Sequence, residues 1–581
     1  MKHIFKDFKF YDYLILILIL GSIITQTFFE MEFIDQGTTM LRLLQSQLDP
    51  TSDIVVEKAD IWAVGLRMLG MALIIVVAII INSSLAATMS GKIARNLRRR
   101  VFNKVNEFSA TEINKFSTPS LITRSTNDVG QVQRTFMMCL RMMFMAPFMA
   151  FFAIRKISLS NMTLTWVAVG YLGVMIAVLV TIIFFVLPKF NIYQKKIDRL
   201  NLVTRENLTG IRVVRAYNAE KYQEKKFDDA NNSLTKLELF VNRIMSIMNP
   251  ALNLIMNLLS LTIYWLGAKL ITSGDIDYAA VLTFSNYGMH VIMSFMFITL
   301  MFVMIPRGLI SLRRLNEILN TDVCVKDGHV SSSEKYGTIE FRNVTFSYPD
   351  AEEAVLENIS FKAEKGETVA FIGSTGSGKS TLINLIPRFY DVTSGQVLVD
   401  GIDVKAYNLE HLHDKIGYVP QKANLFSGDI ESNMKLSKED ASDDEIAKAL
   451  EIAQCGFIEK LEDGYSQPVN QGGKNFSGGQ KQRLSIARAV VKNPEIFIFD
   501  DSFSALDFKT DKNLRSALKK HTKDATILIV AQRVNTIKDA NKIIVLDNGK
   551  MVGMGTHEEL SKSNKVYKEI VASQTKKGGN N

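Results

Sequence analysis

Six long apolar runs before residue 310 limit what this 581-residue chain can fold into. A helix needs roughly 20 largely apolar residues to cross the hydrocarbon core of a bilayer. The six runs have that length and cover residues 13–34, 61–82, 135–154, 163–187, 245–271 and 279–305. We therefore predict an α-helical six-span transmembrane domain in a multi-pass protein of the cell membrane.

Basic residues between the runs predict how the spans are oriented. Segments 85–133 and 188–243 carry eight and twelve Lys or Arg residues, whereas segment 34–60 carries two against five acids. Loops on the cytoplasmic side hold the excess of basic residues. Both long loops and both termini are therefore expected in the cytoplasm. This role accounts for much of the net charge of +9, so we expect no nucleic-acid partner.

The two long loops have the composition of helices. They hold few Gly or Pro residues and keep apolar side chains at three-to-four spacing. The spanning helices are therefore expected to continue below the membrane and to turn back near Pro119 and Gly210. Residues 1–11 mix lysines with apolar side chains, which is typical of a short helix on the inner membrane surface; a flexible basic tail is the alternative.

The composition changes after the sixth run. Residues 321–335 lack an apolar period and form the expected linker. Short β-rich runs then alternate with helical segments, a pattern typical of an α/β domain around a largely parallel sheet. We expect a transmembrane domain with cytoplasmic helix extensions over 1–320, the α/β domain over 336–573 and a disordered tail over 574–581. Three scattered cysteines offer neither a disulfide framework nor a metal site.

The strongest motif lies in the α/β domain. Residues 373–380 read Gly-Ser-Thr-Gly-Ser-Gly-Lys-Ser and fit the P-loop pattern, between a strand-like apolar run and a helix start. The backbone N–H groups of such a loop and the helix N-terminus hold phosphates. Lys379 is expected to reach the β- and γ-phosphates of ATP, and Ser380 to ligate Mg²⁺. The expected ATP-binding residues of this segment are Gly373, Ser374, Thr375, Gly376, Ser377, Gly378, Lys379, Ser380 and Thr381.

Further motifs indicate the type of P-loop domain. Residues 476–480, which contain Ser477, Gly478, Gly479 and Gln480, closely resemble the ABC signature motif. Asp500 ends an apolar run similar to a Walker B strand, and Gln421 stands at the Q-loop position. Asp507 ends a segment that resembles the D-loop, and Tyr348 occupies the aromatic position that stacks on adenine. Six spans followed by one ATPase domain is the layout of an ABC half-exporter.

The resemblance implies ATP-driven export by a dimer. In the ABC family each ATP lies between the P-loop of one chain and the signature motif of the other. A second half-transporter is therefore the expected partner, and residues 477–480 would complete the partner's site. The resemblance also implies Mg²⁺ held by Ser380, Gln421 and Asp500. Segments 117–127 and 207–216 resemble the two regions that couple the ATPase domains to the membrane helices.

Two positions depart from the family pattern. The family normally has Glu after the Walker B Asp, whereas this chain has Asp501, which is one methylene shorter. General-base geometry is demanding, with a reach of about 2.6–3.2 Å. The family's switch His is replaced by Gln532, which donates a hydrogen bond but carries no charge. With Asp501 and Gln532 as the catalytic candidates, ATP hydrolysis at this P-loop is expected to be slow.

The intact signature motif beside these two changes favours one hypothesis. The chain would be the degenerate-site subunit of a heterodimeric multidrug-type exporter. The alternative is that the two changes are neutral substitutions in an active homodimer that exports a lipid or a peptide. A membrane-bound ATP sensor that moves no substrate is a third possibility. The six spans argue against a soluble ABC ATPase that handles nucleic acids.

Methionine is concentrated in the membrane half, which holds 22 of the 25 residues. Methionine is adaptable and recurs on promiscuous binding surfaces, and polar groups inside spans are costly and often functional. A pocket for a small hydrophobic or amphipathic substrate is one explanation, and packing or lipid contact is the other. The expected substrate residues are Met138, Arg141, Met142, Met145, Asn286, Met289, His290 and Met293.

Overall fold

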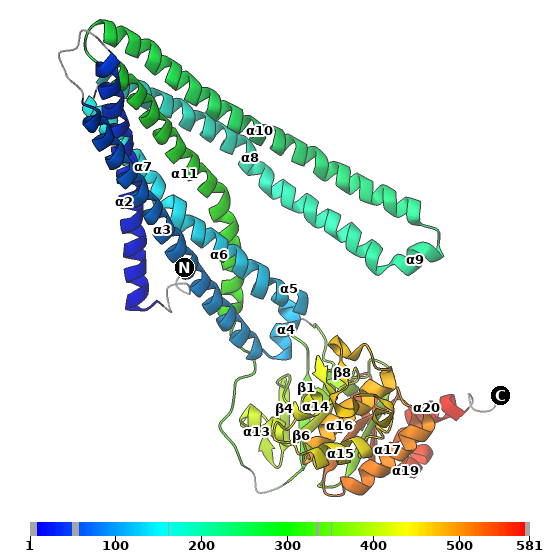
Figure 1. Ribbon diagram of the computed structural model, residues 1–581. Coiled ribbons are helices and arrows are strands. Elements are labelled where there is room, and N and C mark those ends of the chain that lie inside the picture. Colours follow the sequence, from blue (N-terminus) through cyan, green and yellow to red (C-terminus); the bar gives the residue numbers. More distant parts are fainter. Residues whose placement is uncertain (1–7, 49–56, 161, 333–335, 350, 576–581) are drawn as a thin grey trace. The chain divides into compact units, whose positions relative to one another are not determined.

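The computed structural model describes residues 8–48, 57–160, 162–332, 336–349 and 351–575 (Figure 1). The described residues form two compact units. The membrane unit takes its residues from 1–104 and 119–321, and the ATPase unit takes its residues from 105–118 and 322–581. The domain boundaries predicted from the sequence stay a prediction.

Long helices make up the membrane unit. They are α2 (Phe10–Leu48), α3 (Lys58–Asn106), α7 (Met145–Ser160), α8 (Met162–Thr209), α10 (Glu220–Thr272) and α11 (Tyr278–Leu319). Between α3 and α7 the chain forms α4 (Ala110–Phe116), α5 (Thr118–Thr123), the π-helical turn η1 (Arg124–Asp128), α6 (Val129–Met138) and a second π-helical turn, η2 (Cys139–Met143). Six helical segments of the described chain are long and apolar enough to span a membrane, as predicted.

Helices α8 and α10 extend well past their apolar segments. They run side by side as an antiparallel pair and are joined by the short helix α9 (Ile211–Ala216) (Figure 1). Gly210 begins that connection, as the sequence predicted. The apolar run of α8 ends at residue 187, so the remaining six turns or so, up to Thr209, carry polar and basic residues such as Lys189, Lys195 and Lys196.

Apolar side chains serve two purposes in the membrane unit. Helices α2, α7, α10 and α11 bury residues such as Met31, Ile263 and Tyr287 in a shared core. By contrast, Leu66, Leu73 and many other apolar residues of α3 are exposed. A water-soluble protein rarely exposes so large an apolar surface, whereas lipid tails cover it without cost.

The ATPase unit is built on three sheets. A six-stranded sheet has the order β12 (Lys550–Gly555), β11 (Lys542–Asp547), β3 (Thr368–Gly373), β10 (Thr526–Val530), β9 (Ile496–Asp500), β6 (Ile416–Val419). All neighbours in it are parallel except β11 and β12. A four-stranded antiparallel sheet has the order β2 (Leu356–Ala363), β1 (Ile339–Phe346), β4 (Ser394–Val399), β5 (Ile402–Asp403), and β7 (Gly428–Asp429) pairs with β8 (Pro468–Val469).

The two faces of the six-stranded sheet bury different partners. Alternate residues of a strand point to opposite faces. On β3, Val369 and Phe371 pack with the four-stranded sheet, whereas Ala370 and Ile372 pack with the helical side of the unit. The helices of this unit are α12 (Lys379–Asn384), α13 (Leu409–Asp414), α14 (Ile430–Lys435), α15 (Asp443–Ile452), α16 (Gly478–Val491), α17 (Phe508–His521), α18 (Val534–Ile537), α19 (His557–Ser563) and α20 (Lys565–Thr575). The 3₁₀ turns η3 (Ile458–Lys460), η4 (Gly464–Ser466) and η5 (Gln471–Gly473) complete it.

Helix α4 packs with the ATPase unit. Asn114 Nδ2 donates to Tyr390 Oη over 3.2 Å, and Glu112 Oε1 accepts from the backbone N–H of Cys324 over 3.1 Å. These contacts lie just before segment 117–127, the predicted first coupling region.

Parts of three predicted segments lie outside the described residues. They are residues 1–7 of the surface helix, 333–335 of the linker and 576–581 of the disordered tail. Helix α20 runs to Thr575 and so extends into the segment predicted as that tail.

Candidate functional site

One edge of the six-stranded sheet gathers the predicted ATP-site residues. The phosphate loop follows β3, Gln532 follows β10, Asp500 ends β9 and Gln421 follows β6. These four strands are consecutive neighbours and run parallel, so their carboxyl ends meet at the same edge. Segments up to about 160 residues apart in sequence are thereby brought to one place.

The phosphate loop requires glycine at specific positions. A Cβ atom on Gly373 would lie 2.0 Å from the carbonyl oxygen of Leu546. Gly378 has φ of +92°, and a Cβ atom there would lie 2.6 Å from Leu356 Cδ2. Only glycine tolerates both conditions. The loop is therefore held close to the strands on both sides, while Ser374, Thr375 and Gly376 at its tip are exposed and Ser377 is buried.

Lys379 lies inside the curve of this loop. Its Nζ donates to the carbonyl oxygens of Gly373 and Ser374 over 3.0 and 2.6 Å. Burial lowers the pKa of the Lys379 ammonium group. A buried ammonium group ringed by loop backbone is suited to bind an anion, because phosphate oxygens would offset its loss of hydration.

Two neighbouring carboxylates face the loop from the end of β9. Ser380 Oγ donates to Asp500 Oδ1 over 2.8 Å. Asp500 and Asp501 are both buried, and this burial raises the pKa of each carboxyl group. The site thus places a hydroxyl oxygen and a carboxylate oxygen side by side next to the phosphate loop.

Asp501 is held by the two glutamines that the sequence singled out. Its Oδ2 accepts from Gln532 Nε2 over 3.0 Å and from Gln421 Nε2 over 3.4 Å. The residue has φ of +47°, a left-handed conformation that few non-glycine residues adopt. The backbone N–H of Asp501 donates to Val530 on the adjacent strand over 3.0 Å. The carboxylate is therefore turned toward the amides that flank it.

A contact to Gln532 comes from a residue that sequence reasoning missed. Gln574 Nε2 on α20 donates to the carbonyl oxygen of Gln532 over 2.7 Å, and Gln574 Oε1 accepts from the backbone N–H of Val534 over 2.8 Å. The side chain therefore clamps the loop that carries Gln532. No sequence signal pointed to this contact, since Gln574 was assigned to the tail.

The remaining ATP-site candidates are Tyr348, beside the loop, and the residues that begin α16 and α17. Tyr348 Oη lies 3.1 Å from Thr381 Oγ1, which sets its half-buried ring next to the start of α12. Ser477 and Gln480 form a capping box at the exposed start of α16, with Gly478 and Gly479 between them. Asp507 caps α17 by accepting from the backbone N–H of Thr510 over 2.9 Å. The roles assigned to these residues stay predictions.

Two family models match the two halves of the chain. The model described as the ABC transporter transmembrane region matches residues 14–295, and the model described as ABC transporter matches residues 356–504. An uncharacterized ABC transporter ATP-binding protein of Mycobacterium bovis is 38% identical over 89% of this chain and 90% of its own length. The chain belongs to the ABC transporter family. It is a fused half-transporter, an exporter by layout, and such half-transporters work as dimers within a membrane.

Named relatives and a solved structure resemble this ABC half-transporter over most of its length. A putative multidrug export ATP-binding/permease protein of Staphylococcus aureus is 33% identical and covers 87% of this chain and 89% of its own. An ATP-dependent lipid A-core flippase of Haemophilus influenzae is 30% identical and covers 87% of each. The structure of a bacterial Atm1-family ABC exporter with ATP bound shares the fold, with a TM-score of 0.79 at 22% identity over 97% of this chain and 98% of that one.

The predicted substrate residues of the half-transporter lie on α6, η2, α7 and α11. Arg141, Asn286 and Met289 are exposed, whereas Met138, Met142, Met145, His290 and Met293 are half-buried. The π-helical turn η2 lies between Met138 and Met145 and widens the helix there by about one residue. Met145 is therefore rotated around the helix axis relative to Met138. Single π-turns of this kind occur often at functional sites.

A buried carboxylate on α2 was missed by the sequence reading. Gln26 Nε2 donates to Glu30 Oε1 over 2.9 Å and lies 3.9 Å from Met145 Sδ. In the described part of the chain, Glu30 Oε2 and His290 Nδ1 are buried without a hydrogen-bond partner. An ionisable residue inside a span is a signal of function in its own right, and Glu30 carries that signal in the sequence.

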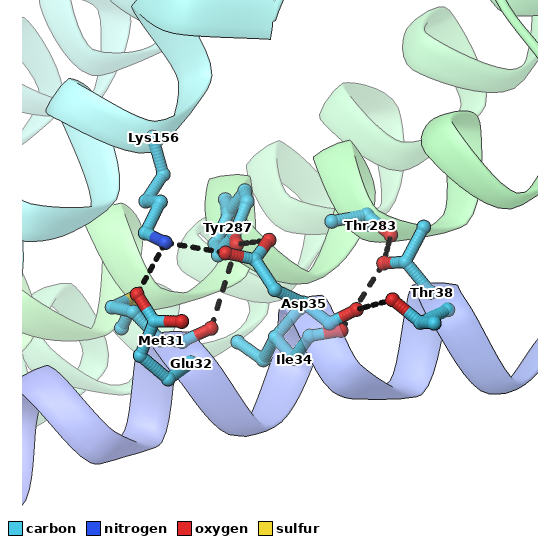
Figure 2. Close-up of polar contacts among 9 residues, drawn as sticks. Met31, Glu32, Ile34, Asp35, Thr38, Lys156, Thr283 and Tyr287 are labelled. Carbon is cyan, nitrogen blue, oxygen red and sulfur yellow. Dashed lines mark hydrogen bonds and ion pairs between the residues drawn. The ribbon is translucent and has the colours of Figure 1, made fainter. Parts of the chain in front are cut away.

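A second polar cluster joins α2, α7 and α11, as Figure 2 shows. Lys156 on α7 bonds to Glu32 over 2.6 Å and also pairs with Asp35, both on α2. Tyr287 on α11 donates to Asp35 and is 2% exposed. One turn away, Thr38 and Thr283 share a hydrogen bond. The cluster lies at the end of the bundle away from the long helix extensions, where α2 and α7 end their apolar runs and α11 begins its own.

Exchanging Lys156 for methionine is expected to destabilise this end of the bundle. The change leaves the carboxylates of Glu32 and Asp35 close together without their shared cation. Removing one partner of a buried ion pair costs several kcal/mol, but these side chains are about a quarter to a third exposed, so we expect a smaller loss of about 1–3 kcal/mol. A thermal unfolding midpoint lowered by several degrees in the purified protein would measure it.

The adjacent arginine supplies a matched control. Arg155 is exposed on the same helix and has no ion pair within the described residues. Arg155→Met should therefore leave the midpoint within experimental error. Adding Asp35→Asn to Lys156→Met should recover part of the loss, since one of the two unpaired charges is removed. Equal midpoints for Lys156→Met and Arg155→Met would contradict a stabilising role for the cluster.

Proposed function

We propose that this chain is the subunit of a heterodimeric ABC exporter whose own ATP site turns over slowly. The observation that supports this most directly is the length and the hydrogen bonding of the Asp501 side chain. Its carboxylate is one methylene shorter than the glutamate typical of the family, and Gln532 and Gln421 both donate to its Oδ2. A general base has to reach the attacking water at hydrogen-bond distance. A short carboxylate turned toward two amides is poorly placed for that task.

The replacement of the switch histidine by Gln532 acts in the same direction. Catalysis of phosphoryl transfer depends on positioning and on stabilising the charge of the transferred group. The amide of Gln532 carries no charge, and its Nε2 is directed to Asp501 over 3.0 Å. The general base at Asp501 and the charge-stabilising group at Gln532 are therefore both less effective in this site.

The same site remains suited to hold ATP with Mg²⁺. The Ser380 hydroxyl and the Asp500 carboxylate lie 2.8 Å apart, and oxygen ligands of this kind are those that Mg²⁺ prefers. We propose that Ser380, Asp500 and Gln421 would hold the ion next to the phosphate loop. When bound, Mg²⁺ neutralises charge on the β- and γ-phosphates. Lys379 would bind the same phosphates. This site would therefore retain ATP although it hydrolyses ATP slowly.

The signature motif of this chain would serve the partner's site. Ser477 and Gln480 cap the N-terminus of α16, and a helix N-terminus stabilises an anion placed there. The start of this helix is exposed, so a nucleotide held by a second half-transporter can reach it. We propose that the partner carries glutamate and histidine at the two positions where this chain has Asp501 and Gln532.

The proposed substrate class is hydrophobic or amphipathic compounds. The flexible side chains of the methionines on α6, α7 and α11 can make apolar contacts with a substrate. The buried Glu30 carboxylate adds an acidic group between α2 and the start of α7. The multidrug relative supports this class, whereas the flippase relative supports a lipid substrate as the second candidate. Loop charge further supports a cytoplasmic location for both termini.

Reconstitution with the partner tests the proposal. We expect the isolated chain to hydrolyse ATP at least about tenfold more slowly than the complex with a second half-transporter, since a misplaced general base costs roughly 10²–10⁴. The same complex in inverted vesicles should accumulate a fluorescent amphipathic cation when ATP is added. Brisk hydrolysis by the isolated chain would favour the homodimer, and normal hydrolysis without any accumulation of lipid, peptide or drug would favour an ATP sensor.

A further inference from the structure

The extensions of α8 and α10 beyond their apolar runs border an open, basic hollow. Its volume is about 550 Å³, and the described residues that line it belong to these two helices. Three lysines lie in the lining, Lys189 and Lys196 from α8 and Lys236 from α10. We call this feature the lysine groove. Asp229 is the acidic residue that also lines it, so the groove carries a net charge of plus two.

Contacts across the groove fix the register of the two helices. Lys189 Nζ lies 5.7 Å above the centre of the Phe240 ring, and Lys196 Nζ bonds to Ser233 Oγ. Tyr193 Oη donates to Glu238 Oε1 over 2.8 Å between these two contacts. Residues 189 and 240 therefore face each other at one end of the groove. Asp229 lies one turn beyond the pair formed by Lys196 and Ser233, at the other end.

The lysines of the groove have no acidic partner among the residues that the structure describes. In the described part of the chain, no ion pair joins Lys189, Lys196 or Lys236 to a carboxylate. Lys236 is exposed, and the amide of Asn232 and the hydroxyl of Ser233 offer further donors on the same face of α10. Residues 229, 232, 233, 236 and 240 follow the three-to-four spacing of one helix face. The groove is thus a concentrated set of hydrogen-bond donors suited to bind an anion.

One end of the groove meets the membrane-spanning part of α8. The apolar run of that helix, residues 163–187, ends two residues before Lys189. Phe184 and Phe185, on the turn above, and Ile247 on α10 are exposed apolar side chains. Phe240 and Leu237 add apolar surface inside the groove. Donors for an anion are therefore continuous with surface that suits acyl chains.

We propose that the lysine groove binds the headgroup phosphate of an anionic phospholipid. Basic pockets between membrane helices near the bilayer surface recognise such headgroups. The three ammonium groups spread over about 10 Å along α8 and α10, since seven residues of helix span that length. The acyl chains would then run along Phe184, Phe185 and Ile247 into the bilayer. The site is separate from the ATP site, so it does not rest on the proposed function.

Native mass spectrometry of the delipidated, full-length dimer tests this site. Phosphatidylglycerol should be retained at lower concentration than phosphatidylcholine. The triple variant Lys189→Gln, Lys196→Gln, Lys236→Gln should bind phosphatidylglycerol at least about tenfold more weakly, because each lysine near an anionic headgroup contributes roughly a fivefold factor. Millimolar inorganic phosphate should leave the lipid bound. Displacement of the lipid by phosphate would overturn the proposal in favour of a soluble anion.

Matched variants control for the loss of positive charge in general and for effects on folding. The triple variant Lys195→Gln, Lys221→Gln, Lys225→Gln removes the same charge from exposed positions of α8 and α10 outside the groove and should bind the lipid as the parent does. The single change Lys236→Gln removes an exposed side chain without a described partner, and should weaken binding about fivefold in a folded protein. Equal lipid binding by the two triple variants, or by Lys236→Gln and the parent, would overturn the proposal.

Discussion

Exchanging Asp501 for glutamate and Gln532 for histidine is expected to raise ATP turnover at this chain's own site by about a hundredfold or more, in a complex whose partner has a disabled phosphate loop. The longer side chain would carry its carboxylate past Gln421, which now donates to Asp501 over 3.4 Å. Histidine would bring a group that can carry positive charge to the position where Gln532 now donates to Asp501. The steady-state ATPase rate of this complex, compared with the same complex of the parent chain, measures the gain.

The double variant needs controls for the site of hydrolysis. Adding Lys379→Ala should abolish the gain, because Lys379 is the ammonium group inside the phosphate loop. Each single change should yield less than the pair, since positioning of the water and stabilisation of the charge both contribute. A double variant that binds ATP but is no faster than the parent would contradict the idea that these two residues limit turnover.

Exchanging Gly478 for aspartate is expected to lower the ATPase rate of the complex with the partner by about a hundredfold or more, as loss of one transition-state donor does. The new carboxylate would lie at the N-terminus of α16, where the partner's nucleotide is proposed to bind. A Cβ atom on Gly478 would meet no atom within 4 Å. The variant should therefore fold, and the loss can be assigned to charge. The ATPase rate and ATP-driven accumulation in vesicles should fall together.

Two further variants separate this effect from the chain's own site. Gly478→Ala adds a methyl group without charge and should cost far less than Gly478→Asp. Asp501→Asn in the same complex should change the rate by less than about twofold, because this chain's own site contributes little to turnover in the proposed scheme. If Asp501→Asn and Gly478→Asp cost the same, the two ATP sites are equivalent and the proposal of a degenerate site is wrong.

Motif spacing and apolar length allowed much of the architecture to be predicted. Six runs of about 20 apolar residues predict spanning helices, because the thickness of the hydrocarbon core sets one length for all of them. Six helical segments that are long and apolar enough to span a membrane are found among the described residues. The phosphate loop lies between β3 and α12, as the alternation of residues 368–380 predicted. Local sequence determines such features because the strand, turn and helix signals lie within a few residues of one another.

Contacts between distant segments could not be predicted in this way. Residues at three-to-four spacing share a face of one helix, but the spacing does not say which helix lies opposite. Lys156, Asp35 and Tyr287 come from three helices, and only their packing brings them into one cluster (Figure 2). The lysine groove likewise depends on the register of α8 against α10.

In the ATP site, some features follow from the local sequence and others from the tertiary structure. The sequence by itself determined that Asp501 and Gln532 replace the residues typical of the family, since the motifs around them are short and contiguous. Only the tertiary structure decided that Gln421, Gln532 and Asp501 share hydrogen bonds, and that Gln574 clamps the loop of Gln532. These contacts join the ends of β6, β9 and β10 with α20, and their geometry depends on strand pairing and helix packing rather than on local sequence.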